Sequence, residues 1–229
     1  SSTLLNALEV FIENNGGVIN LQSPVTKVVI EDSKVLGVET KETFIRFDKV
    51  ISTIPLPYVN ITIPDLPHEI SKKFDSVNNI AVVCVIAKLK KSVSENFWMN
   101  INDPDMDIPG LVEYSNLRSM ENNIVYVPFY MPGEHDKFAD SDDVFISKVK
   151  KYLKIINKDL DDDDFIDIRA SRYRFAQPIC EPEFISKLPP RNLSISGLWV
   201  ADTSYYYPED RGISESIDFG RSMAKEVID

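Results

Sequence analysis

The stretch that decides the fold lies near the carboxyl end and reads Gly197-Leu-Trp-Val-Ala-Asp202, Thr-Ser-Tyr-Tyr-Tyr-Pro-Glu-Asp-Arg211 and Gly212-Ile-Ser-Glu-Ser-Ile-Asp-Phe-Gly220. The apolar residues before Asp202 predict a short buried strand that ends in a carboxylate. After a loop, Gly212 opens a final helix over residues 214–228, and a helix start presents free N–H groups and a partial positive charge. This arrangement offers a carboxylate to the hydroxyls of a ligand, and backbone donors to its carbonyl or phosphate groups.

The rest of the chain predicts short strands joined by polar turns, with helices at both ends. Residues 3–15 predict an amphipathic helix that stops at Gly16-Gly17, and residues 18–54 predict a meander of short strands. The apolar run 79–89 predicts a strand buried on both faces. Further elements are expected at these positions: strands over 110–115, 124–130 and 166–175, and a helix over 142–156. We therefore expect an α+β fold with a mostly antiparallel sheet.

Composition excludes several classes of protein. The 229 residues, 43% hydrophobic and 27% charged, suit one large or two small globular domains. The 36 acidic residues outnumber the 25 basic ones, and the net charge of −11 argues against a nucleic acid or an anionic membrane as partner. Cys84 and Cys180 form no CxxC pair, so we expect no metal site and a reducing, cytoplasmic setting. No apolar run approaches the roughly 20 residues that span a membrane.

Four familiar motifs are absent from the sequence. The eight glycines form neither GxGxxG nor a P-loop. The acidic run 159–164 lacks the glycine and the glutamate of a calcium-binding EF-hand, because Asp164 and Ala170 occupy those positions. Residues 212–216 nearly match the GxSxG nucleophile elbow, but the fifth position is Ser216 and no histidine follows, so the hydrolase order is impossible.

The carboxyl-terminal pattern resembles the carboxyl half of the flavin-containing amine oxidase superfamily, with protoporphyrinogen oxidase, phytoene desaturase and UDP-galactopyranose mutase-like flavoproteins as relatives. Those proteins end in a strand plus Gly-Asp, a loop, and a Gly-opened helix with a later Ser-Gly. Here Ala201-Asp202 stands for Gly-Asp, with alanine in place of the first glycine, and Phe219-Gly220 stands for Ser-Gly. Other segments that agree in order are residues 4–19, Pro24-Val-Thr-Lys-Val28, residues 48–55 and Ala176-Gln177-Pro178.

The resemblance implies a partial, Rossmann-like FAD-binding portion formed by the two ends of the chain. It divides the chain into a partial FAD-binding portion (1–57), a substrate-binding domain (58–178) and a C-terminal FAD-binding segment (179–229). The family's Gly-rich βαβ unit, which holds the FAD pyrophosphate, would lie upstream of this sequence, so we expect a fragment of a longer flavoprotein. Such a fragment is expected to lose FAD, to purify colourless and to be inactive.

The resemblance also assigns roles to single residues. FAD would be bound by Asp202, by the backbone N–H groups of Gly212 and Ile213, by Arg211 and, at the adenine, by Val25. The alternatives for these positions are a helix cap or turn carboxylate, an ordinary helix start, a surface ion pair and a core strand residue.

The residues expected to bind substrate are Tyr206, Tyr207 and Arg174. Residues 205–207, three consecutive tyrosines, could equally pack on the core. Arg172 and Arg174 share one face of a strand and could equally be solvated. No residue is identified as catalytic, and no metal ligand set is found.

The expected function is that of an FAD-dependent oxidoreductase, which oxidises a C–N or C–C bond of a small molecule by hydride transfer to flavin. A redox-neutral enzyme similar to UDP-galactopyranose mutase is the alternative on the same scaffold. A non-enzymatic binding domain with a vestigial cofactor motif is the alternative from another class.

Overall fold

The computed structural model describes residues 2–228 and divides them into two compact units. Unit 1 contains residues 2–75, 189–202 and 211–228, and unit 2 contains residues 76–188 and 203–210. These boundaries differ from those of the functional domains expected from the sequence: residues 58–75 belong to unit 1, whereas 179–188 and 203–210 belong to unit 2. The architecture is α+β, as predicted.

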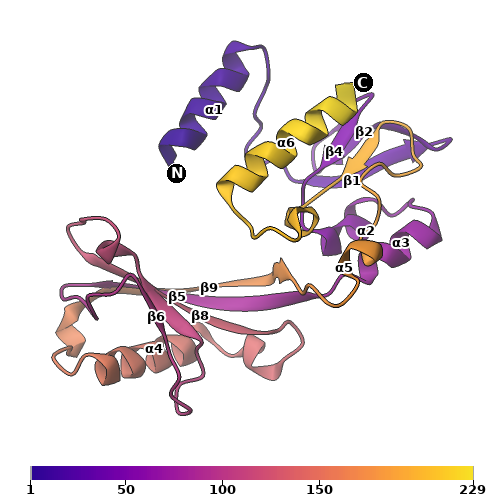
Figure 1. Cartoon of the computed structure of the whole chain (residues 1–229). Coiled ribbons are helices and arrows are strands. Elements are labelled where there is room, and N and C mark those ends of the chain that lie inside the picture. Colours follow the sequence, from indigo (N-terminus) through magenta and orange to yellow (C-terminus); the bar gives the residue numbers. More distant parts are fainter. Residues whose placement is uncertain (1, 229) are drawn as a thin grey trace. The chain divides into compact units, whose positions relative to one another are not determined.

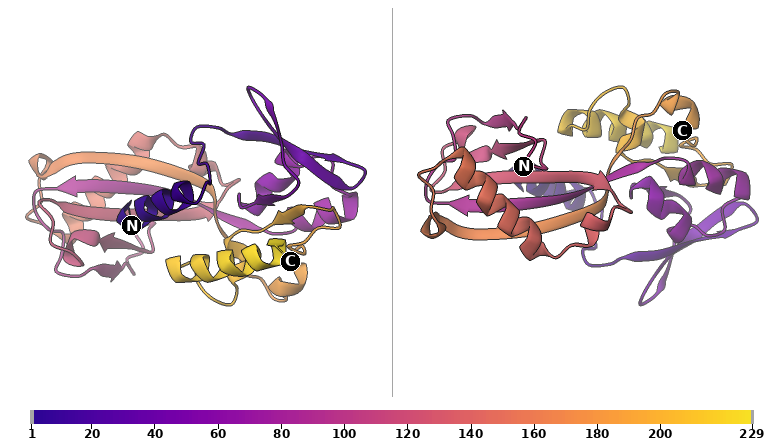
Figure 2. Two further views of the ribbon diagram at one scale, coloured as in Figure 1. Left: turned by 90° about the horizontal axis from the view of Figure 1, so that it is seen from above. Right: turned by 90° about the horizontal axis from the view of Figure 1, so that it is seen from below.

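Unit 2 is built on one antiparallel sheet with the strand order β6-β7-β8-β5-β9. Its strands are β5 (Asn79–Leu89), β6 (Trp98–Asn100), β7 (Gly110–Glu113), β8 (Asn123–Pro132) and β9 (Phe165–Pro178). Helix α4 (Asp142–Ile156) lies along one face of this sheet (Figures 1 and 2). The predicted sheet and its covering helix are therefore confirmed.

The expectation that residues 79–89 are buried on both faces is wrong. In β5 the odd-numbered residues from Ala81 to Leu89 are fully buried, and those from Val83 onward belong to the core that α4 covers. The even-numbered residues lie on the other face, where Ile86 is 36% exposed. Because apolar residues occupy both faces of the strand, the alternation of buried and open positions is hidden in the sequence.

Unit 2 also contains short elements, between its strands and after β9. They are η2 (Tyr114–Asn116), η3 (Asp136–Ala139), η4 (Asp162–Asp164), α5 (Phe184–Lys187) and η5 (Thr203–Tyr206). The acidic run at η4 forms a capping box, in which Asp161 caps the turn and the Asp164 side chain accepts from the Asp161 N–H at 3.0 Å. Lys91 binds the same Asp164 carboxylate at 2.9 Å. A capped acidic turn therefore explains this run.

The first three strands of unit 1 form an antiparallel meander, and the chain then changes direction. The meander consists of β1 (Val25–Glu31), β2 (Lys34–Thr40) and β3 (Phe44–Arg46). The next strand, β4 (Val50–Ser52), leaves the meander and pairs in parallel with β10 (Leu198–Val200). The prediction of one meander through residue 54 is therefore wrong for its last strand, because that strand finds its partner near the other end of the chain.

The helices of unit 1 are α1 (Ser2–Asn14), η1 (Leu56–Tyr58), α2 (Val59–Thr62), α3 (His68–Asp75) and α6 (Ile213–Ile228). Helix α1 has the predicted amphipathic pattern, yet none of its described residues is buried. In α6 only Met223 is buried, and Ile217 is 40% exposed. Within residues 2–228, no helix is both long and apolar enough to cross a bilayer.

Candidate functional site

The parallel pair of β4 and β10 delivers Asp202 to the end of a buried strand, as the sequence predicts. Leu198 and Val200 are fully buried. The Val50 N–H donates to the Gly197 carbonyl at 2.7 Å, and the Ala201 N–H donates to the Ser52 carbonyl at 3.0 Å. These bonds bring the carboxyl ends of the two strands together, which is where α/β folds place their ligands.

The Asp202 side chain has a partner in its own unit. Its Oδ2 accepts a hydrogen bond of 2.9 Å from the backbone N–H of Leu56, the first residue of η1. The two residues are 146 positions apart in the sequence. This contact is a backbone cap of the kind that the sequence left open as the alternative to a ligand contact.

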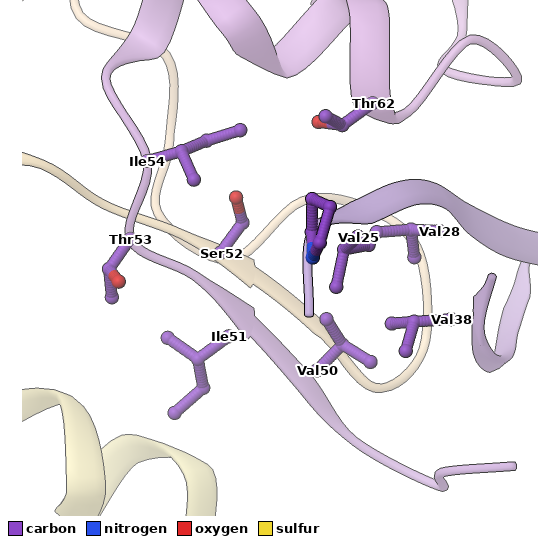
Figure 3. A pocket seen from close by; sticks show the side chains of 10 residues that line it. Val25, Val28, Val38, Val50, Ile51, Ser52, Thr53, Ile54 and Thr62 are labelled. Carbon is purple, nitrogen blue, oxygen red and sulfur yellow. The ribbon is translucent and has the colours of Figure 1, made fainter. Parts of the chain in front are cut away.

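A pocket of about 380 Å³ lies in unit 1, between the meander and β4 (Figure 3). It is lined by Pro24, Val25, Val28, Val38, Val50, Ile51, Ser52, Thr53, Ile54 and Thr62. Figure 3 shows the valines of β1 and β2 gathered opposite Val50, whereas Ile51 points away to the other side of β4. None of the lining residues is charged, so the pocket suits a largely apolar group of moderate size.

Val25, the predicted adenine contact, lies at this pocket. It is the first residue of β1, pairs with Thr40 of β2 and is 41% exposed. The sequence pointed separately to residues 24–28 and 48–55, and the structure shows that both segments line one pocket. The contribution of Val38 and Thr62 was missed, and no periodicity or motif in the sequence could have revealed it.

The start of α6 is also as predicted, with Gly212 just before the first helical residue, Ile213. The Gly212 carbonyl accepts from the backbone N–H of Ser216 at 3.1 Å and from its hydroxyl at 2.7 Å. The Glu215 carboxylate folds back over Gly212, at the place that a Cβ of residue 212 would take. A carboxylate there is favoured by the partial positive charge of the helix start. Ile213 is 59% exposed, and Arg211 is exposed on the preceding loop.

Comparison with known proteins identifies the family of this chain. The model of the flavin-containing amine oxidoreductase family matches residues 1–176, more than three quarters of the chain. The chain belongs to this family. A search of curated protein sequences gave no match.

Three solved structures share the fold of this chain. A protein described as a protoporphyrinogen oxidase from Exiguobacterium sp. 255-15 has a TM-score of 0.73 at 16% identity, covering 96% of this chain and 50% of its own. An oxidoreductase from Methanosarcina mazei has a TM-score of 0.65 at 19% identity, covering 86% and 47%. Reduced UDP-galactopyranose mutase has a TM-score of 0.57 at 10% identity, covering 76% and 39%. The chain thus spans half or less of the length of each of these structures.

The expected substrate residues lie in unit 2. Tyr206 ends η5, and the ring of Tyr207 packs edge-on against Phe184, with ring centroids 5.5 Å apart. The Arg174 guanidinium pairs with the Glu134 carboxylate at 3.2 Å, and both side chains are at least half exposed. The structure thus places these residues in one unit, and the expected cofactor residues in the other.

Arg172 lies on the same face of β9 as Arg174, but its guanidinium binds groups of neighbouring elements. Its guanidinium donates to the carbonyl of Phe138 at 2.6 Å and to that of Asp140 at 2.9 Å, and it pairs with the Asp142 carboxylate. Arg172 therefore holds η3 and the start of α4 against β9.

A second hollow, of about 200 Å³, lies in unit 2 beside a cluster of ionisable groups. The Asp107 carboxylate accepts from Lys148 at 2.5 Å, from the Tyr152 hydroxyl at 2.5 Å and from Lys137 at 3.2 Å. Partial burial acts to raise the pKa of Asp107, but these three donors outweigh it and hold that pKa well below its ordinary 3.8. Burial and the bond to Asp107 raise the pKa of Tyr152. The cluster ties the loop before β7 to α4.

Glu113 is a buried carboxylate that the sequence analysis did not single out. It is 0% exposed at the end of β7. Its oxygens accept from the backbone N–H groups of Val93 at 2.9 Å and Ser94 at 2.8 Å, and from the Ser92 hydroxyl at 2.7 Å. This set of donors fixes the turn after β5.

Proposed function

We propose that this chain is part of an FAD-dependent oxidoreductase and that unit 1 binds the adenosine portion of FAD in the pocket between the meander and β4. The observation that carries the proposal is the pocket itself, because it joins Val25 to the β4 segment that pairs with the strand ending in Asp202. Membership of the flavin-containing amine oxidoreductase family supports FAD as the ligand.

The residues of the pocket fit this ligand. The lining offers methyl groups to the faces of a nucleobase, and the hydroxyls of Ser52, Thr53 and Thr62 to its polar edge or to a sugar. A volume of about 380 Å³ lies within the range of roughly 300–1,000 Å³ typical of small-molecule sites.

The remaining roles follow the sequence analysis. Asp202 would support the sugar portion of the cofactor, while Arg211 and the N–H groups of Gly212 and Ile213 would face its electron-rich groups. When bound, flavin would supply the chemistry of oxidising a C–N or C–C bond, as acceptor of the hydride that leaves the carbon. Tyr206, Tyr207 and Arg174 of unit 2 would bind the small-molecule substrate. The likeness to UDP-galactopyranose mutase keeps a redox-neutral flavoenzyme as the second candidate.

A pocket-filling substitution tests the proposal. Val25→Trp places an indole at the pocket, and Val18→Trp is the matched control, because Val18 is 78% exposed in the same unit and does not line the pocket. Titrating each protein with FAD and with ADP, followed by fluorescence or calorimetry, should show affinity for both ligands lowered at least about tenfold by Val25→Trp alone, a loss of some 1.4 kcal/mol. Equal affinities of the two variants at unchanged melting temperatures would refute the assignment of the pocket.

A further inference from the structure

We propose that Asp202 is a positioning residue, whose carboxylate fixes the loop of residues 53–55 that forms one wall of the unit 1 pocket. The identity of the pocket's ligand rests on the proposed function, but the ordering of the loop does not. Asp202 orders this loop whether or not a ligand is bound.

Two hydrogen bonds bracket this loop. On one side, the Ala201 N–H donates to the Ser52 carbonyl at 3.0 Å, where β4 ends. On the other side, the Leu56 N–H donates to Asp202 Oδ2 at 2.9 Å. The adjacent residues Ala201 and Asp202 therefore hold both ends of the same loop.

The chemistry of the loop explains why a side chain is needed at its far end. The sequence there is Pro55-Leu56-Pro57, and proline has no backbone N–H. Leu56 thus carries the only N–H among these three residues. As the first residue of η1, it has no acceptor within its own helical turn. A carboxylate is a strong acceptor for such a group.

The bond connects a rigid part of unit 1 to the pocket wall. Leu56 is fully buried, as is Val59 at the start of α2, so this end of the loop is anchored in the core. Thr53 and Ile54, between the two bonds, line the pocket. Loss of the Asp202 bond would release the wall without removing a lining residue.

Three variants of this chain separate positioning from other roles. Asp202→Ala removes the acceptor, and Asp202→Asn retains a side-chain oxygen that can accept from Leu56. Asp218→Ala removes an exposed carboxylate from α6 of the same unit as a control. Hydrogen–deuterium exchange is measured without ligand over residues 53–56, together with the melting temperature. FAD titrations of the same proteins follow.

In Asp202→Ala, exchange over residues 53–56 should rise roughly ten- to hundredfold, as expected for loss of a hydrogen bond to a charged acceptor. The Asn variant should restore slow exchange there, and the Asp218 control should change nothing. FAD affinity should fall with Ala and recover with Asn.

Unchanged exchange over residues 53–56 in Asp202→Ala would overturn the proposal. So would a uniform rise throughout unit 1, which would mean general destabilisation. If Asn restores slow exchange in the loop but not FAD affinity, the carboxylate also contacts the cofactor directly, and the ordering of the loop by Asp202 stands. If Val25→Trp and Val18→Trp bind FAD and ADP equally while the loop responds as expected, the cofactor assignment fails and the positioning role stands.

Discussion

Replacing Glu113 with glutamine perturbs the most deeply buried carboxylate of unit 2 while keeping its shape. Glu113 Oε1 accepts from the Val93 N–H and the Ser92 hydroxyl, and Oε2 accepts from the Ser94 N–H. Glutamine has one side-chain oxygen, so an NH2 group must face a buried backbone N–H that has lost its acceptor. A lost charged hydrogen bond and an orphaned buried donor together cost about 2–4 kcal/mol. That is a large share of the roughly 5–15 kcal/mol that stabilises a typical domain.

Urea unfolding followed by tryptophan fluorescence measures this effect. Of the two tryptophans, Trp98 lies in β6 of unit 2 and Trp199 in β10 of unit 1. A Trp199→Phe background makes the signal report on unit 2. Glu121→Gln, at an exposed position of the same unit, is the control for the lost charge. A destabilisation below about 1 kcal/mol, or one no larger than that of the control, would show that the reasoning about buried donors is wrong.

Two further expectations concern unit 2. Arg172→Ala should lower the free energy of unfolding of unit 2 by about 2–3 kcal/mol, because two carbonyls and a carboxylate lose their donor. Arg174→Ala breaks an exposed ion pair and should cost under about 1 kcal/mol. Equal costs of the two variants in urea titrations would contradict this expectation. The lowered pKa of Asp107 means that its contribution to stability is complete above its ordinary pKa of 3.8 and is lost as the pH falls from there toward the folded value. Asp107→Asn should therefore be destabilised at pH 7 and lose less further stability than wild type between pH 4 and pH 2, as measured by urea titrations at each pH.

The sequence predicted the elements whose signal is local. The strands and helix of unit 2 follow from apolar periodicity, and Asp202 follows from the buried run before it. The partner of β4 could not be found in this way, because Val50 pairs with Leu198 far along the chain. Only the resemblance of residues 48–55 to a segment of the flavin-containing amine oxidase superfamily pointed away from the meander.

Side-chain roles were harder to predict than strands. A glutamate at the end of a short strand gives no sign that it will be buried, so Glu113 was missed. Arg172 and Arg174 have the same spacing and charge, yet one binds two carbonyls and the other pairs at the surface. Such differences depend on which loop lies opposite, and that is set by tertiary contacts.

The uncovered apolar surface of unit 1 governs how this chain behaves in solution. Among the described residues, no strand pairs with the second edge of β4, and the apolar side chains of α1 remain exposed. Open strand edges and bare hydrophobic stripes promote self-association. The net charge of −11 opposes it by mutual repulsion, whose range shrinks to about 10 Å at 0.1 M salt. Colloidal stability is therefore greatest at low ionic strength, and added salt shifts the balance toward clustering.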